Sequence, residues 1–254
     1  VTNNASLTFN RSDDLTASNA ISGTGSLQKS GSGVLTLSGT NSYTGVTTIS
    51  AGVLSISSFV SGGSNSNIGA SASTASNLVL DGGTLRYTGA AVSTARLFTL
   101  TNNGGTIEGS GSGALTFTGT GPIAHTGNST RTLTLGGTTS SNTFSQLLEN
   151  GTGNTSLIKV GSGTWIVSGA NTYSGSTTIS AGTLSVSSTG NLGSTSNIIN
   201  LNGGTLSITG STAFSSARVI NVLASSTINN ANSGHLTFTG NIAGPTSATS
   251  ATLT

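Results

Sequence analysis

The sequence predicts an all-β protein folded as a parallel β-helix, a β-solenoid whose coils take about 18–26 residues. Two stretches, Leu27–Ser58 and Leu157–Ser188, share 20 of 32 positions without a gap. Runs with an apolar residue at every second position recur between glycine-rich corners. A short repeated unit buries its apolar side chains against neighbouring units, so it stacks in one dimension.

Strands are predicted where apolar and polar residues alternate, because this pattern gives a strand one buried face. Clear runs are Val34–Ser38, Val53–Ser57 and Leu133–Leu135. Between such runs, Ser-Gly, Asn-Gly and Gly-Gly pairs supply the backbone angles that tight corners require. Helix-forming runs are scarce, so we expect almost no helix.

The spacing of these runs sets the expected coil length. Similar runs return after about 18–26 residues, as from Leu35 to Leu54, from Leu54 to Leu80 and from Leu115 to Leu133. Three short strands and three corners need about this length. We therefore expect one β-helix over residues 1–254, with 27–58 and 157–188 as its best-preserved repeats.

The two copies belong to a longer period of about 120–130 residues. Near its end the chain reaches Thr252–Thr254, which matches Thr132–Thr134 of the first period. Because the second period stops there, we expect the sequence to be a segment of a longer protein.

The composition excludes several classes of function. Only 5% of the residues are charged, while glycine alone takes 38 positions. The seven Lys and Arg residues stand singly, whereas nucleic-acid binding needs clustered cations, so we expect no nucleic-acid partner. No apolar run is long enough to cross a bilayer, so direct membrane insertion is not expected. The lack of cysteine excludes disulfides and thiol chemistry.

The repeated string resembles the passenger-associated repeat of autotransporters. In the second copy it runs from Gly161-Ser162-Gly163-Thr164 through Ser168–Gly175 to Thr177–Leu184. The resemblance implies a right-handed parallel β-helix exported by type V secretion through a C-terminal outer-membrane barrel of a Gram-negative bacterium. It further implies an extracellular stalk or adhesin, attached to the outer membrane or secreted. The motif carries no catalytic residues in that family, so none are transferred.

A β-helical polysaccharide-cleaving enzyme is the main alternative. Such enzymes gather several carboxylates to bind calcium or to act as acid and base. Here the five carboxylates are scattered and unrepeated, and the adjacent pair at the start belongs to a predicted turn; they are Asp13, Asp14, Asp81, Glu108 and Glu149. We therefore expect no catalytic residues and no enzyme.

Metal and cofactor sites are not expected either. His125 and His235 occupy unrelated places in the repeat and have no ligand-type neighbours at suitable spacing. We expect both to face solvent or to lie at corners. The glycines around Ser32 and Ser162 lack the Lys-Ser/Thr and the helix that a phosphate loop needs, so they indicate corners.

The candidates for ligand contact are Tyr43 and Tyr173, with Asn41 and Asn171, which occupy matching positions of the two copies. A tyrosine beside an amide can stack on a sugar ring while the amide bonds its hydroxyls. The same residues can instead cover a corner and bond the backbone of a turn, and this structural role is the favoured interpretation. The expected partners are surface glycans or proteins, or further copies of the solenoid.

Three further residues carry predictions. Trp165 replaces Leu35 on the face predicted to point inward, so we expect it in the core. Arg96 and Arg218 occupy matching positions of the two periods. We expect each side chain to lie on a solvated flank or to form a salt bridge with a carboxylate, rather than to bind an anion.

A filament-forming or ice-binding face is another alternative. It is suggested by the pairs Thr47-Thr48 and Thr177-Thr178, which do not recur in every coil.

Overall fold

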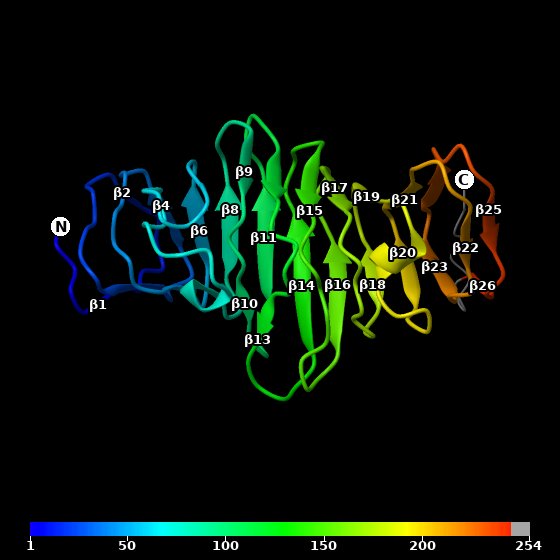
Figure 1. The fold of residues 1–254 in the computed structure, drawn as a ribbon, viewed down its shortest axis with the longest axis horizontal. Coiled ribbons are helices and arrows are strands. Elements are labelled where there is room, and N and C mark those ends of the chain that lie inside the picture. Colours follow the sequence, from blue (N-terminus) through cyan, green and yellow to red (C-terminus); the bar gives the residue numbers. More distant parts are fainter. Residues whose placement is uncertain (245–254) are drawn as a thin grey trace.

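The computed structural model describes residues 1–244 and confirms the predicted parallel β-solenoid. Coils follow one another along the long axis from the N-terminus towards β26, as Figure 1 shows. Among the described residues, the helical content is two short 3₁₀ turns, η1 (Ala75–Asn77) and η2 (Thr189–Leu192). The match at Thr252–Thr254 lies outside the described residues.

One sheet runs the whole length of the stack, and each coil adds one strand to it. We call it the long sheet. Its strands are β2 (Leu15–Ala17), β4 (Val34–Leu37), β6 (Val53–Ile56), β8 (Thr84–Tyr87), β11 (Gly105–Gly109), β14 (Arg131–Gly136), β16 (Thr155–Lys159), β18 (Thr177–Ile179), β20 (Ile199–Asn202), β23 (Ile220–Ala224) and β26 (Ile242–Ala243).

Two shorter sheets complete the faces of the solenoid. The first side sheet contains β1 (Ser6–Phe9), β3 (Ser26–Lys29), β5 (Thr47–Ile49), β7 (Leu78–Leu80), β10 (Thr99–Leu100) and β13 (Ala124–His125). The second side sheet contains β9 (Val92–Thr94), β12 (Leu115–Phe117), β15 (Asn142–Phe144), β17 (Thr164–Val167), β19 (Thr183–Val186), β21 (Thr205–Ile208) and β24 (Thr227–Asn230). A two-stranded sheet joins β22 (Phe214–Ser216) to β25 (Leu236–Phe238).

Most coils have the predicted length, but some are longer. Leu35 pairs with Leu54 in the next coil, as expected. Leu54 then pairs with Leu85 rather than with Leu80, so this coil exceeds the predicted range. The added length is a loop that follows β6 and ends in η1. Alternation alone could not reveal it, because an inserted loop leaves the strand pattern on either side intact.

The other predicted pair was also wrong. Leu115 lies on β12 in the second side sheet, whereas Leu133 lies on β14 in the long sheet. Their spacing therefore connects two faces of the solenoid rather than two successive coils.

The two copies of the repeat do not occupy the same faces. In the first copy, Leu27 lies on β3 in the first side sheet, and β4 follows in the long sheet. In the second copy, Leu157 lies on β16 in the long sheet, and β17 follows in the second side sheet. The second copy is thus shifted by one face relative to the first. The intervening coils have strands on all three faces and make the change possible.

The core is a set of stacked aliphatic side chains, joined in the middle coils by a cluster of aromatic rings. There, aromatic rings replace aliphatic side chains: Phe117 packs edge-on against Phe59, with ring centroids 5.7 Å apart, and stacks on Trp165 at 6.5 Å. Trp165 is fully buried, and its indole Nε1 donates a 2.8 Å hydrogen bond to the Gly136 carbonyl. This confirms its predicted place in the core.

Candidate functional site: the repeated clasps and the uncharged surface

The four candidates for ligand contact are buried. Asn41, Tyr43 and Tyr173 are 0% exposed, and Asn171 is 5% exposed. Their side chains present no face to a ligand from solvent. The ligand-contact interpretation is therefore replaced by the structural one, because each of them bonds within the stack.

The two asparagines join three successive coils. Asn171 accepts a 2.9 Å hydrogen bond at Oδ1 from the backbone N–H of Leu148, one coil before it. Its Nδ2 donates at 2.7 Å to the carbonyl of Asn191, one coil after it. Asn41 makes the matching bonds in the first copy. Each carboxamide thereby satisfies two buried backbone groups that the strand ladders leave unpaired.

Each tyrosine bonds a threonine four residues later. The hydroxyl groups of Tyr43 and Thr47 are 2.7 Å apart, and those of Tyr173 and Thr177 are 2.6 Å apart. Burial raises the pKa of Tyr43 to about 12, and burial also raises the pKa of Tyr173. Thr47 and Thr177 therefore point inward, which removes half of each Thr pair from the proposed ice-binding face.

The two matching arginines are buried donors, and the predicted solvated flank or salt bridge was wrong. Arg96 donates from Nε to the Val60 carbonyl at 2.8 Å and from Nη2 to the Gly69 carbonyl at 3.0 Å. Arg218 donates from Nη2 to the Gly193 carbonyl at 2.6 Å. Burial lowers the pKa of both guanidinium groups, yet carbonyl and hydroxyl oxygens accept hydrogen bonds from their donors.

These residues form one repeated unit, which we call the clasp. The first clasp consists of Asn41, Tyr43, Thr47, Asn67, Gly69 and Arg96, and the second of Asn171, Tyr173, Thr177, Asn191, Gly193 and Arg218. Sequence reasoning missed Asn67 and Asn191, although both begin a matching Asn-x-Gly triplet.

A buried lysine that bonds backbone carbonyls is repeated at the corners. The ammonium group of Lys159 donates to the carbonyls of Val160, Gly161 and Ala181 at 2.7, 2.8 and 3.1 Å, and so joins two coils. Lys29 contacts the carbonyls of Gly31 and Ala51 in the same way. Burial lowers the pKa of Lys159 to about 8.

The corner lysines were also missed from the sequence, although a signal is present. Lys29 and Lys159 each follow an inward leucine by two residues, which places them on the buried face of the strand. A lysine at an inward position needs acceptors, and the adjacent Gly-Ser-Gly corner supplies carbonyl oxygens.

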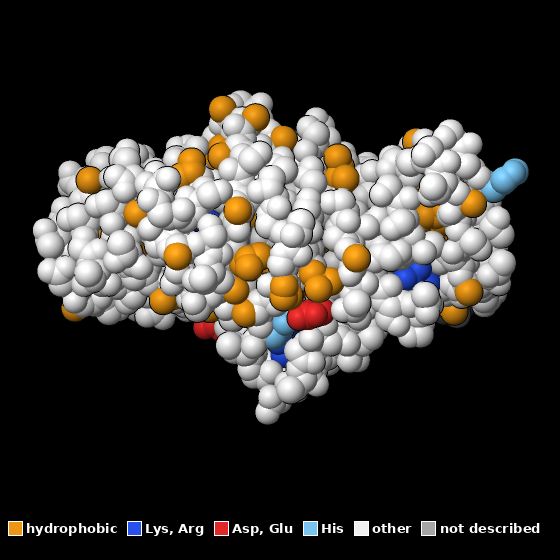
Figure 2. Space-filling model, in the orientation of Figure 1, with side chains coloured by type: hydrophobic (Ala, Val, Ile, Leu, Met, Phe, Trp, Pro, Cys, Tyr) orange, Lys and Arg blue, Asp and Glu red, His pale blue; other side chains and the backbone are white. Residues whose placement is uncertain are grey.

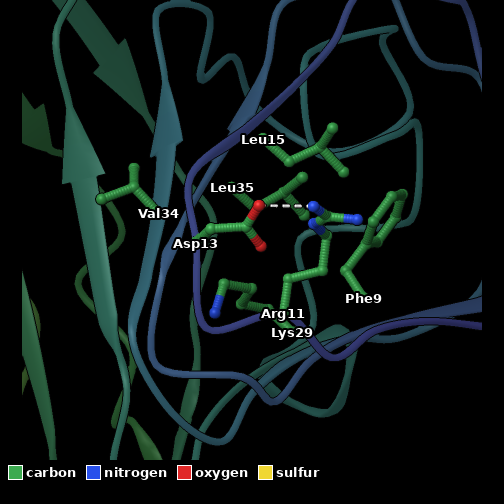
Figure 3. A pocket seen from close by; sticks show the side chains of 7 residues that line it. All are labelled: Phe9, Arg11, Asp13, Leu15, Lys29, Val34 and Leu35. Carbon is green, nitrogen blue, oxygen red and sulfur yellow. Dashed lines mark hydrogen bonds and ion pairs between the residues drawn. The ribbon is translucent and has the colours of Figure 1, made fainter.

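The carboxylates remain dispersed, as the sequence predicts. Arg11 and Asp13 form an exposed ion pair at 2.5 Å beside a depression of about 10 Å³, shown in Figure 3. The hydrogen bond from Arg11 holds the pKa of Asp13 below its usual range. Arg86 pairs with Glu108 at 2.6 Å on the long sheet. Within residues 1–244, no three His, Cys, Asp or Glu side chains are grouped to hold a metal ion.

An apolar pocket of about 280 Å³ opens at the first coil. It is lined by Val1, Leu7, Phe9, Thr16, Ala17, Ser18, Asn19 and Ile21. Leu7 and Ala17 pair with the buried Leu27 and Leu37 of the next coil, so the pocket adjoins the apolar core at the first coil. Its lining contains no acid, base or nucleophile with the neighbours that catalysis needs.

His125, which was predicted to face solvent or to lie at a corner, instead occupies the last strand of the first side sheet. It is partly buried, and burial together with the nearby charge of Arg131 lowers its pKa to about 4. Among residues 1–244, its Nε2 has no hydrogen-bond partner, and neither do Nε and Nη1 of Arg131. His125 is thus a neutral histidine at a place where buried polar groups are incompletely satisfied. His235 is exposed, as predicted.

The surface of the second half carries almost no charge. After Glu149 the sequence contains no carboxylate, and its only Lys and Arg residues are Lys159 and Arg218, both buried. On the long sheet, Asn221 donates to Asn200 at 3.0 Å and Asn200 to Thr178 at 3.3 Å, which forms an amide and hydroxyl ladder. Figure 2 shows how few charged side chains reach this side of the molecule.

The fold is a parallel β-solenoid, and the residues shared by its two repeats pack the coils against one another. Residues 27–56 and 157–186 match the family model of the passenger-associated-transport-repeat. This match confirms the resemblance to autotransporter passenger domains.

A curated relative supports the same class. The chain is 48% identical over 151 residues to the adhesin BmaC autotransporter of Brucella suis biovar 1 (strain 1330). The aligned part covers 58% of this chain and 4% of that protein, so the chain spans a small part of its relative. No solved structure matches the chain significantly. Among residues 1–244, no helix is both long and apolar enough to cross a bilayer.

Proposed function

We propose that this chain is a stalk segment of an autotransporter passenger, exposed at the bacterial surface or secreted, that also makes adhesive contacts. The observation that carries the proposal is the long sheet, which continues without interruption from β2 to β26. Each coil is joined to the next by strand ladders, and the clasps and buried lysines add further links. Such a stack grows along one axis, so it can hold an attached domain at a distance.

The adhesive part of the proposal rests on the uncharged surface. Its outward side chains are amides, hydroxyls and single aliphatic groups, which bury without the desolvation cost of a charge. Repeated weak contacts along a rigid stack add up through multivalency. Uncharged surface glycans, surface proteins or another solenoid are the partners that fit this surface. The relative is named an adhesin, which supports the same role.

The proposal includes no enzymatic role. Apart from the adjacent Asp13 and Asp14, the carboxylates of the described residues are separated along the stack, and Glu108 is already paired with Arg86. The candidate tyrosines and asparagines are committed to the clasps. A polysaccharide-cleaving site would need carboxylates that face one sugar from two sides.

The test separates adhesion from spacing. Cells displaying the full passenger are compared with variants that carry Thr178→Lys, Asn200→Lys and Asn221→Lys, which charge the ladder and leave the length unchanged. Lysines in place of Gln28 and Thr48, on the outer face of the first side sheet, are the matched control.

We expect the ladder variant to lose adhesion and the control to retain it. Deleting residues 157–176 removes one coil, because Leu157 pairs with Thr177 in the next. If adhesion follows the number of coils and ignores the lysines, the segment is a spacer without adhesive contacts.

A further inference from the structure

The chain contains three Asn-Gly pairs: Asn103-Gly104, Asn150-Gly151 and Asn202-Gly203. In such a pair the glycine nitrogen can attack the asparagine side-chain amide, because glycine has no side chain to hinder the approach. Asparagine is for this reason among the thermolabile residues. The sequence does not distinguish the three pairs, but the structure does.

Asn150 is fixed by three hydrogen bonds. Its Oδ1 accepts from the backbone N–H groups of Thr155 at 2.9 Å and of Ser174 at 3.1 Å. Its Nδ2 donates to the Ser174 hydroxyl at 2.8 Å. The carboxamide must break these bonds before it can turn towards the nitrogen of Gly151.

Both reacting groups of the Asn103-Gly104 pair are also held. Nδ2 of Asn103 donates to a carboxylate oxygen of Asp81 at 2.8 Å. The backbone nitrogen of Gly104 donates to the Thr101 carbonyl at 3.0 Å in a tight turn. The attack would have to open this turn.

Asn202 lies in a different environment. It is the exposed last residue of β20, at the point where the register against β23 shifts between Leu201 and Asn202. Its side chain makes no hydrogen bond to any of residues 1–244. One contact restrains the nucleophile: the nitrogen of Gly203 donates to the Ser226 hydroxyl at 2.9 Å.

We propose that Asn202-Gly203 is a site of spontaneous deamidation in the folded protein. The Gly203 nitrogen forms a bond to Cγ of Asn202 and loses its proton, and the bond from Cγ to the side-chain nitrogen breaks. Ammonia leaves, and a five-membered succinimide remains. Water then opens the ring at either carbonyl and yields aspartate or isoaspartate.

The modification changes the chemistry of this part of the surface. The first of the two long periods already carries an acid at the matching position, because Leu80-Asp81-Gly82-Gly83 corresponds to Leu201-Asn202-Gly203-Gly204. The Asp81 carboxylate accepts a 2.6 Å hydrogen bond from the Thr101 hydroxyl. After Glu149 the sequence has no other carboxylate. Deamidation therefore places the first negative charge on a surface that otherwise has none, and isoaspartate adds a backbone atom where the coil turns.

The test follows the three pairs in one sample. The folded chain is incubated at mildly alkaline pH, and peptide mapping by mass spectrometry measures the gain in mass when the side-chain amide becomes a carboxyl. We expect conversion at Asn202 to be at least about tenfold faster than at Asn150, because three hydrogen bonds must break there. In concentrated urea the chain is unfolded, so the deamidation rates of the three pairs should become similar, because only the local sequence then determines them.

Two variants complete the test. Ser226→Ala frees the Gly203 nitrogen, so it should accelerate conversion at Asn202 and leave Asn103 and Asn150 unchanged. Asn202→Gln should remove the product. Slower or equal conversion of Asn202 relative to Asn150 in the folded chain overturns the proposal, and so does a ranking that urea leaves unchanged.

Discussion

Replacing Asn171 by alanine tests whether the clasp holds the coils together. The substitution removes the partner of the buried Leu148 N–H and of the buried Asn191 carbonyl. Leaving a buried backbone group unpaired costs about 1–3 kcal/mol, so the two together should lower the free energy of unfolding by about 3 kcal/mol. The side chain is 5% exposed, so water reaches these groups poorly.

The size of the thermal shift follows from the chain length. The entropy of unfolding is about 2.1 cal/mol/K per residue, which gives about 0.5 kcal/mol/K for this chain. A loss of about 3 kcal/mol therefore corresponds to a decrease in the melting temperature of about 6 °C. Circular dichroism in the far ultraviolet follows the melting, since the structure is almost entirely strand.

The matched control is Asn202→Ala, which removes an exposed amide without a hydrogen bond to the described residues. It should change stability by less than about 0.5 kcal/mol. Asn41→Ala in the first copy should behave like the Asn171 variant. If Asn171→Ala melts within a degree of Asn202→Ala, the two hydrogen bonds do not support the stack and the account of the clasp is refuted.

Three further predictions follow from packing and charge. Gly182→Ala should lower the free energy of unfolding by about 2 kcal/mol or more, because φ is +61° and a Cβ would overlap two corner carbonyls. In the control variant Gly190→Ala, the added Cβ meets nothing closer than 3.8 Å. Thermal melts compare the two variants. The pKa of His125 is lowered to about 4 in the fold and lies near 6.5 when unfolded, so its contribution to stability is complete above pH 6.5 and falls as the pH drops towards 4. Urea unfolding at several pH values should show this loss, reduced in His125→Gln but retained in His235→Gln. Trp165→Ala should cost about 3–5 kcal/mol by equilibrium unfolding, and a loss below about 1 kcal/mol would contradict its place in the core.

The strands could be predicted because their signal is local. Alternation at Val34–Ser38 or Val53–Ser57 fixes which side chains face inward, and the structure places these strands as expected. Coil length depends on which distant residues pair between coils, so the local pattern did not predict the loop between Leu54 and Leu85. For the same reason, the sequence did not predict that the second copy is shifted by one face of the solenoid relative to the first.

The chemistry of the clasp was harder to predict than the strands. A matched Tyr and Asn in a repeat fit a ligand site and a structural turn equally well from sequence. Burial decides between them, and it depends on the coils on either side. The prediction that Arg96 lies on a solvated flank or in a salt bridge failed for a related reason, because arginine is rarely buried. Its carbonyl partners Val60 and Gly69 belong to a loop that the strand pattern does not predict.

A distance along the long sheet tests most directly whether the coils stack in register along one axis. Thr84 and Asn221 lie in one outward column, separated by six strand-to-strand steps through Thr106, Thr134, Ile158, Thr178 and Asn200. At about 4.8 Å per step their separation is about 29 Å.

The chain has no cysteine, so Thr84→Cys and Asn221→Cys give two unique positions for spin labels. Pulsed electron–electron double resonance should show one narrow distribution centred at about 29 Å, the sum of the six strand spacings. A broad distribution, or a centre that departs from this value by more than two strand spacings, would contradict the stacked solenoid.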